Sequence, residues 1–326
     1  VMEEGWHLPM RSAQPWLAGF VKAHPNFVRP ATRYHELTSL LSNPLPESLC
    51  ITRPKTRVPW GIPVPFSPDH VTYVWFDALL NYISAPGYLT DAKRFARFWP
   101  ADVQFIGKDI LRHHAVYWPI ILHMLGLPDA QMPQMIFAHG WWKIGEQKMS
   151  KSLGNIVDPS VVLGQVLKGQ PYAADVYRYF LLRDVPFGQD GNFSEDALLT
   201  RLNADLANDL GNLVNRACSM LERYSQGTIP APAAIGCAVE DEPLRKAAVG
   251  LPAAVEQAME RVEFSAALEA IMRVVAQANR YIETAAPWKL AKQPDAAARL
   301  QGVLHVLAEV IRIVAITLEP FMPSVS

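Results

Sequence analysis

Cysteine is scarce in this chain, and none of it stands in a metal-binding or disulfide pattern. The 326 residues contain three cysteines, Cys50, Cys218 and Cys237, which lie far apart and form no CxxC pair. Zinc knuckles and disulfide frameworks need closely spaced cysteines, so neither is expected within this chain and no metal site is predicted. Sparse cysteine is also typical of a reducing compartment, which predicts a cytoplasmic location.

The chain also lacks a charge excess, a membrane-spanning run and a secretion signal. Lys plus Arg number 30 and Asp plus Glu 31, so the net charge of −1 gives no sign of nucleic-acid binding, and any RNA contact must come from a local basic surface. No apolar run is expected to reach the length of a bilayer span, and the N-terminus has no signal-peptide layout, so no membrane association is predicted. At this length we expect two or three domains.

Two kinds of local pattern meet in the chain. Up to about residue 160, short apolar runs alternate with helical patterns, which favours a parallel α/β sheet. The predicted strands are Ser48–Thr52, Val71–Phe76, Val103–Ile106 and Met135–Ala138, with a helix over Asp109–Leu125. From about Pro171 onward, apolar residues recur every three or four positions, which predicts helices. The predicted helices are Asn203–Arg223, Leu251–Arg261, Ser265–Thr284 and Ala296–Leu318.

A lysine-containing pentapeptide carries the strongest chemical signal. Lys148-Met149-Ser150-Lys151-Ser152 places two ammonium groups three positions apart, where both can reach a triphosphate. Gly145 and Gly154 bracket the segment and allow it to move. Such cations suit the charge that develops on pyrophosphate when an α-phosphate is attacked. The alternative is a solvated basic loop.

This pentapeptide resembles the KMSKS signature of class I aminoacyl-tRNA synthetases, and further blocks resemble the methionine-specific branch of that family. The blocks are Trp60–Pro65, Val74–Tyr82, Phe105–Ile110 with His114 and Trp118, Asn203–Leu206 and Ala286–Trp288. Several independent blocks agree in order and spacing, from about Glu4 to Pro323. The resemblance therefore implies a methionyl-tRNA synthetase, which activates L-methionine with ATP and Mg²⁺ and transfers it to the 3′ end of tRNA(Met), the initiator tRNA included.

The same resemblance implies a fold class and a domain division. The fold is a partial Rossmann-like α/β catalytic domain followed by an all-α helical bundle that binds the anticodon. Residues 1–50 are the remainder of a connective insertion, and residues 51–158 are the second half of the catalytic domain with the lysine loop. Residues 159–195 form a bridging module that contacts the tRNA stem, and residues 196–326 form the anticodon-binding domain.

Site residues follow from the resemblance position by position. Lys148 and Lys151 are implied as catalytic residues. ATP binding is implied for Gly107, Asp109, His139, Gly140, Trp142, Lys148, Ser150 and Lys151. Methionine binding is implied for Arg53, Trp75, Ala78, Leu79, Tyr82, Ile110, His114 and Trp118. Anticodon binding is implied for Asn212, Arg216 and Trp288.

The chemistry of these residue types suits the implied roles, and each set has a simpler alternative. An aromatic-lined pocket with few polar groups suits a thioether, but the same aromatic residues could be core. Asp109 could hold ribose hydroxyls or merely cap the helix that follows it. Asn212 and Arg216 share a helix face, and an exposed Trp288 could stack on an unpaired base, or all three could be structural.

One family motif is missing from the chain. No H-x-G-H sequence, whose histidines contact the ATP phosphates in class I synthetases, occurs anywhere in it. We therefore expect a fragment that starts within the connective insertion and does not form the adenylate by itself, which ATP–pyrophosphate exchange by the isolated chain would contradict. Any zinc would belong to the absent N-terminal region, and the parent is expected to be a monomer, or a homodimer through a region outside this chain.

Two other functions stay open. The chain could belong to a class I synthetase for leucine, valine, isoleucine or cysteine, although the aromatic and anticodon sets disfavour this. It could also be a non-catalytic tRNA-binding protein derived from a synthetase. The intact lysine loop argues against the second alternative, because a binding module would not need it.

Overall fold

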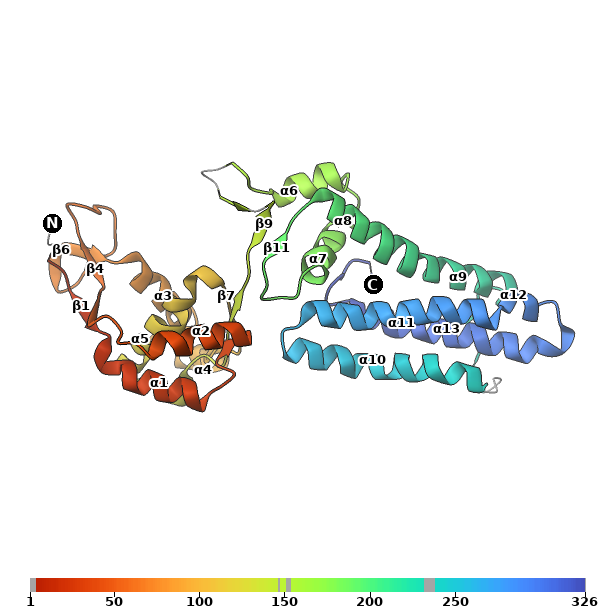
Figure 1. The fold of residues 1–326 in the computed structure, drawn as a ribbon, viewed down its shortest axis with the longest axis horizontal. Coiled ribbons are helices and arrows are strands. Elements are labelled where there is room, and N and C mark those ends of the chain that lie inside the picture. The colour runs from red at the N-terminus through yellow and green to blue at the C-terminus, as the bar shows by residue number, and fades with distance from the viewer. Residues whose placement is uncertain (1–3, 146, 151–153, 232–237, 326) are drawn as a thin grey trace. The chain divides into compact units, whose positions relative to one another are not determined.

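The computed structural model describes residues 4–145, 147–150, 154–231 and 238–325, which belong to two compact units (Figure 1). The first unit ends at Trp141 and mixes strands with helices, whereas the second begins at Trp142 and is mostly helical. Each unit has its own hydrophobic core. The four-part domain division stays a prediction.

A parallel three-stranded sheet lies in the first unit. Strand β8 (Ile136–His139) pairs in parallel with β2 (Val28–Arg29) on one side and with β7 (Gln104–Gly107) on the other. The strands predicted at Val103–Ile106 and Met135–Ala138 are thus confirmed within one residue at each end. Consecutive side chains of β8 are buried, as expected for a strand covered on both faces, but Phe105 of β7 is 51% exposed, so that expectation was wrong for one face of β7.

The other strands of the first unit form small antiparallel sheets, so the parallel arrangement predicted for them was wrong. The pairs are β1 (His7–Pro9) with β3 (Ser48–Cys50), and β6 (Ser67–Thr72) with β4 (Thr52–Pro54) and β5 (Pro63–Val64). The single strand predicted over Ser48–Thr52 is divided at Ile51. The Ile51 amide donates to the carbonyl of Trp6, and its carbonyl accepts from the amide of Tyr73, so the chain changes sheets there.

The strand predicted over Val71–Phe76 was also wrong in its second half. Strand β6 ends at Thr72, and helix α3 (Val74–Ser84) begins after Tyr73, whose backbone is extended. The apolar run therefore covers a strand end and a helix start. Periodicity alone does not separate these, because short apolar runs occur in both.

The helix predicted over Asp109–Leu125 is present but irregular. It opens with a 3₁₀ turn (Lys108–Ile110), passes through a π-helical turn (His113–Tyr117) and ends as α5 (Trp118–Met124). His114, Trp118 and Ile121, which recur at helical spacing along it, are buried. Wide helical turns of this kind are often found at functional sites. The remaining helices of this unit are α1 (Gln14–Ala23), α2 (Ala31–Leu41) and α4 (Ala92–Phe98).

The second unit opens with a small sheet and continues into helices. Strand β9 (Trp142–Ile144) pairs with β10 (Gln147–Lys148) in antiparallel and with β11 (Gly191–Asn192) in parallel. Between these strands lie α6 (Pro159–Val161) and α7 (Ala173–Arg183). After β11 a continuous helical stretch runs through α8 (Glu195–Arg201), a π-helical segment (Leu202–Gly211) and α9 (Asn212–Ser225).

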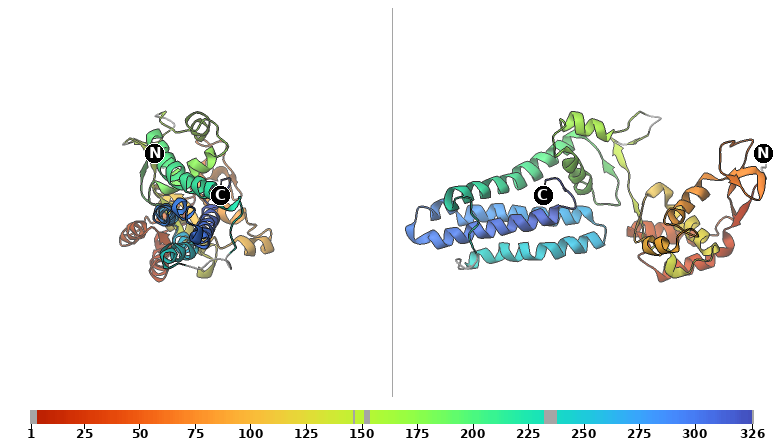
Figure 2. Two further views of the ribbon diagram at one scale, coloured as in Figure 1. Left: turned by 90° about the vertical axis from the view of Figure 1, so that its right-hand side faces the viewer. Right: turned by 180° about the vertical axis from the view of Figure 1, so that it is seen from behind.

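Long helices complete the second unit, as the periodicity predicted, although the first of them begins at Glu242 and not at the predicted Leu251. They are α10 (Glu242–Glu260), α11 (Phe264–Ala285) and α13 (Ala297–Leu318), with the short α12 (Pro287–Leu290) between the last two. Both views of Figure 2 show α10, α11 and α13 running alongside one another. Apolar residues from all of them form one core.

Helix α13 corrects one expectation from the sequence. Among the described residues, Pro294–Leu318 is the one segment long and apolar enough to cross a membrane by length and composition, although half of its most apolar window is buried inside the protein. The core helix of a bundle meets the same criteria, and α13 packs against α9, α10 and α11. It is therefore weak evidence for a membrane span.

Candidate functional site

The predicted nucleotide-binding residues of the first unit meet at one edge of the parallel sheet. Gly107 ends β7 and His139 ends β8, and the two are paired in register, so Asp109 and Gly140 follow at the carboxyl ends of adjacent parallel strands. This edge is where open α/β sheets bind their ligands. The structure thus brings together four residues that the sequence predicted for one role.

The polar contacts at this edge hold Asp109 in place. The indole Nε1 of Trp141 donates to Asp109 Oδ1 at 3.2 Å, and the Lys108 ammonium lies 4.3 Å from the centroid of the Trp141 ring. A Cβ on Gly107 would lie 2.7 Å from Asp109 Oδ1, so any larger residue there would displace the carboxylate. Glycine at 107 therefore lets Asp109 approach the strand end closely.

The lysine-containing hairpin lies in the second unit. Lys148 is the last residue of β10, opposite Lys143 of β9, and is exposed. Asn155 closes the segment, because its Oδ1 accepts from the Ser150 amide at 2.8 Å and its Nδ2 donates to the Lys148 carbonyl at 3.2 Å. The sequence did not assign this bridging role to Asn155, because its partners stand five and seven positions earlier in the chain.

Two further nucleotide-binding predictions fall at this hairpin. Trp142, the first residue of β9, packs its ring 5.5 Å from that of Phe180, so it is tied to the core of the second unit. Lys151 lies outside the described residues. Gly145 and Gly154 both have positive φ, of 60° and 65°, which explains the glycines that bracket the segment.

The predicted methionine residues cluster around a tyrosine–histidine pair in the first unit. The Tyr82 hydroxyl lies 3.0 Å from His114 Nε2, and His114 Nδ1 lies 3.0 Å from the Ile110 carbonyl. Because a carbonyl only accepts, Nδ1 must carry a proton, and in neutral His114 the Nε2 atom accepts from Tyr82. Burial lowers the pKa of His114, against the opposing effect of the Ile110 carbonyl, and burial raises the pKa of Tyr82. Both side chains are therefore uncharged at neutral pH.

Aromatic rings surround this pair to different depths. Tyr82 lies 5.9 Å from Trp118 between ring centroids, and Trp75 approaches His114 edge-on at 6.5 Å. Trp118 and Leu79 are 0% and 1% exposed and belong to the core of the first unit, whereas Ala78 is exposed. The sequence missed His113, whose ring stacks on Trp75 at 3.9 Å. Burial, His114 and Arg112 together lower the pKa of His113.

Arg53 has a different setting from the rest of the methionine set. It stands on β4, with its guanidinium carbon 4.0 Å from the centroid of the Tyr73 ring. It lines a cavity of about 260 Å³ together with residues that include Thr72, Tyr73 and Asp77. Its predicted role in methionine binding stays a prediction.

The predicted anticodon residues meet on the surface of the helical unit. Arg216 from α9 donates to Glu283 of α11 at 2.6 Å, and its guanidinium carbon lies 6.0 Å from the centroid of the Trp288 ring on α12. Trp288 is 36% exposed, and Asn212 is exposed one helical turn before Arg216. Glu283 was not predicted, because its contact joins residues 67 positions apart.

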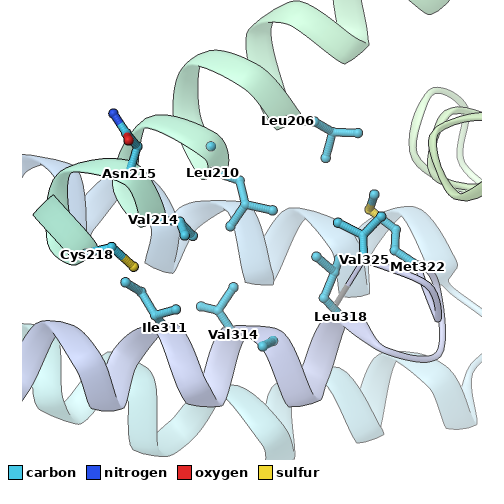
Figure 3. A pocket seen from close by; sticks show the side chains of 12 residues that line it. Leu206, Leu210, Val214, Asn215, Cys218, Ile311, Val314, Leu318, Met322 and Val325 are labelled. Atoms are coloured by element: carbon cyan, nitrogen blue, oxygen red, sulfur yellow. The ribbon is translucent and has the colours of Figure 1, made fainter. Parts of the chain in front are cut away.

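Apolar side chains line a separate cavity of about 610 Å³ in the helical unit (Figure 3). Leu210 of the π-helical segment and Cys218 of α9 face it from one side, Ile311 and Leu318 face it from α13, and Val325 also lines it. None of the predicted site residues lines it. Among the described residues, no group of three or more His, Cys, Asp or Glu side chains could hold a metal ion.

Comparison with known proteins gives a consistent result over both units. A family model described as "tRNA synthetases class I (M)" matches residues 1–218, and a model described as the anticodon-binding domain of tRNA ligase matches residues 248–326. The chain is 44% identical over 325 residues to the methionine–tRNA ligase of Caldanaerobacter subterraneus subsp. tengcongensis, covering 99% of this chain and 49% of the relative. It is 43% identical over 328 residues to that of Lactococcus lactis, covering 100% of this chain and 47% of the relative.

Solved structures agree with these relatives. The Mycobacterium tuberculosis methionyl-tRNA synthetase bound by methionyl-adenylate matches with a TM-score of 0.89 and 42% identity, over 98% of this chain and 61% of that chain. The free form of the same synthetase matches with a TM-score of 0.86 and 40% identity, over 98% and 60%. The chain spans about half the length of the curated relatives it matches.

Proposed function

Because this chain belongs to the methionyl-tRNA synthetase family, we propose that it serves the ATP-dependent activation of methionine and the transfer of the methionyl group to tRNA(Met). The observation that carries this proposal is the neutral Tyr82–His114 pair within a cluster of aromatic rings, joined in one chain to the lysine hairpin. A thioether side chain carries no charge and is polarizable, so an uncharged aromatic cluster with a single polar pair suits it.

In the proposed first step, methionine and ATP react without a protein nucleophile. The methionine carboxylate attacks the α-phosphorus of ATP, the bond to the β-phosphate oxygen breaks, and pyrophosphate leaves. Gly107, Asp109, His139 and Gly140 would position the nucleotide at the sheet edge, and Trp142 and Ser150 would complete its surroundings. Lys148 and Lys151 would stabilise the charge on the leaving pyrophosphate. Magnesium is proposed as the counter-ion of the ATP phosphates.

In the proposed second step, a ribose hydroxyl of the terminal adenosine of the tRNA attacks the carbonyl carbon of the adenylate and AMP leaves. The helical unit would read the anticodon meanwhile. Trp288 would stack on an unpaired base, while Asn212 and Arg216 would bond its edges. The ion pair with Glu283 holds the Arg216 guanidinium carbon 6.0 Å from the centroid of the Trp288 ring, so the two side chains are already close together before RNA binds.

The proposed activity is tested by ATP–pyrophosphate exchange with the protein that carries this chain, expressed from its complete gene. We expect exchange to depend on methionine and to be far weaker with leucine, valine, isoleucine or cysteine. Exchange that depends on one of those amino acids instead would identify another class I synthetase. No exchange with any amino acid, together with retained tRNA binding, would favour the non-catalytic alternative.

Replacing Trp288 by alanine is expected to weaken tRNA binding about tenfold, because one base–aromatic stack is lost, while leaving adenylate formation unchanged. Filter binding with a CAU transcript and with a changed anticodon would measure this, and the loss should be larger for the CAU transcript, because its anticodon is the one that occupies the proposed site. The matched control is Val249→Ala, which removes an exposed apolar side chain (74% exposed) from α10 of the same unit. An equal loss on both transcripts would contradict anticodon reading by Trp288.

A further inference from the structure

A local positive charge distinguishes the β4–β6–β5 sheet from the rest of the first unit. Residues 52–72 contain three cations, Arg53, Lys55 and Arg57, and one carboxylate, Asp69, which gives a net +2 in a chain whose total is −1. Two of these cations, Lys55 and Arg57, stand in the turn between β4 and β5. Lys55 is half-buried and Arg57 is exposed. The sheet therefore offers a small basic surface.

The same turn presents the most exposed aromatic ring among the described residues. Trp60 is 82% exposed, and its neighbours on this sheet, Ile62 and Phe66, are 55% and 60% exposed. Phe66 is braced edge-on by Trp6 at 4.9 Å. Large rings are seldom left this open to water, and exposed aromatic surface of this kind marks interaction sites.

The backbone that carries Trp60 is anchored, so its exposure does not come from a loose loop tip. A Cβ on Gly61 would lie 2.7 Å from the side chain of the fully buried Val71, so only glycine lets the chain lie this close to β6. Directly after it, the Ile62 carbonyl accepts from the Thr72 amide at 2.8 Å. Trp60 also borders the cavity of about 260 Å³ that Arg53 lines, so a flat group stacked on its ring has a recess beside it.

A flat ring that shares a turn with cations has the chemistry that binds single-stranded nucleic acid, in which a base stacks on the ring and the phosphates meet the cations. A paired base would not be available for stacking. We propose that the β4–β6–β5 sheet binds the unpaired 3′ end of the tRNA, with Trp60 stacked on a base and with Lys55 and Arg57 near the phosphates. This proposal rests on the proposed function, which supplies tRNA as the partner.

The test compares an intact tRNA(Met) transcript with the same transcript trimmed of its unpaired 3′ nucleotides. Trp60→Ala is expected to weaken binding of the intact transcript about tenfold and to leave binding of the trimmed one unchanged, since one stacked base is worth about that much. Trp60→Phe should restore most of the affinity, because it keeps an aromatic face. Lys55→Gln should reduce the salt dependence of binding to the intact transcript. The slope of the logarithm of the binding constant against the logarithm of the salt concentration should become shallower by about 0.7, the contribution of one phosphate contact.

The matched control is Phe98→Ala on α4, which removes an exposed ring (56% exposed) that also lies beside an arginine, Arg97, but outside this sheet. Phe98→Ala should change the affinity for neither the intact nor the trimmed transcript. If Trp60→Ala weakens both transcripts equally, or neither, the 3′-end proposal is wrong while the anticodon preference of the wild-type chain still supports the proposed function. If the wild-type chain shows no preference for the CAU transcript, the proposed function is wrong. The proposal that this sheet binds tRNA is then wrong as well, because it rests on that function.

Discussion

Replacing Lys148 by alanine is expected to lower the rate of methionine-dependent pyrophosphate exchange about 100-fold, the usual effect of removing one group that stabilises transition-state charge. Methionine affinity should change little, because the ammonium interacts most strongly with charge that develops only as pyrophosphate leaves. The variant should thus lower kcat and leave KM for methionine near its original value. Exchange kinetics over a range of methionine concentrations would separate the two.

Lys143 supplies the matched control for this prediction. It faces Lys148 across the β9–β10 pair, but its ammonium lies 3.8 Å from Asp190, so it already has a partner within the second unit. Lys143→Ala should therefore reduce exchange much less than Lys148→Ala. Equal losses for the two variants would show that the exchange reaction responds to local charge or hairpin stability, and would remove the special role of Lys148.

Much of the fold could be predicted because long or buried elements leave a periodic signal. The helices α11 and α13 begin and end within one residue of their predicted bounds, and β7 and β8 lie where buried apolar runs stand. The fold class, a class I catalytic domain with an anticodon-binding domain, is confirmed by the family models. Strands β9, β10 and β11 were not predicted, since they are two or three residues long and therefore too short to leave a periodic signal.

The candidate site was predictable in its residue types and less so in its contacts. Gly107 and His139 follow two predicted strands, so their meeting at one edge could be anticipated from the parallel arrangement. Glu283, His113 and Asn155 could not be assigned, because their roles depend on which side chain lies opposite them after folding. Trp118 is entirely buried, so the sequence could not separate a pocket wall from core packing.

A buried ion pair accounts for one part of the helical unit that the site does not use. Asp241 is fully buried at the start of α10 and receives two hydrogen bonds from Arg299 of α13, at 2.8 and 2.7 Å. The Tyr281 hydroxyl of α11 donates to the same carboxylate at 2.6 Å. Burial alone would raise the pKa of Asp241, but the bonds from Arg299 and Tyr281 outweigh it and hold that pKa below its ordinary value. One carboxylate thereby joins three helices.

Asp241→Ala is expected to lower the free energy of unfolding of the helical unit by about 3 kcal/mol, because it leaves a guanidinium and a phenol without their buried acceptor. We place the loss at the low end for a broken buried pair, since the Arg299 side chain keeps 25% exposure and can regain water. Urea unfolding followed by the helical circular dichroism signal would measure it. Asp241→Asn keeps the shape and loses the charge, so an intermediate loss is expected.

The acid dependence of stability gives an independent check on the same carboxylate. A group whose pKa is lowered by folding contributes fully above its unfolded pKa, about 4 for aspartate, and loses that contribution as the pH falls through the lower folded pKa. Stability of the wild-type unit should therefore decline on acidification below that range, and the decline should be shallower in Asp241→Asn. Glu269→Ala breaks the exposed ion pair with Arg273 on α11. It should change neither the urea concentration at the midpoint of unfolding nor the acid dependence of that midpoint. A midpoint loss as large in Glu269→Ala as in Asp241→Ala would mean that burial of the carboxylate is not what stabilises this junction.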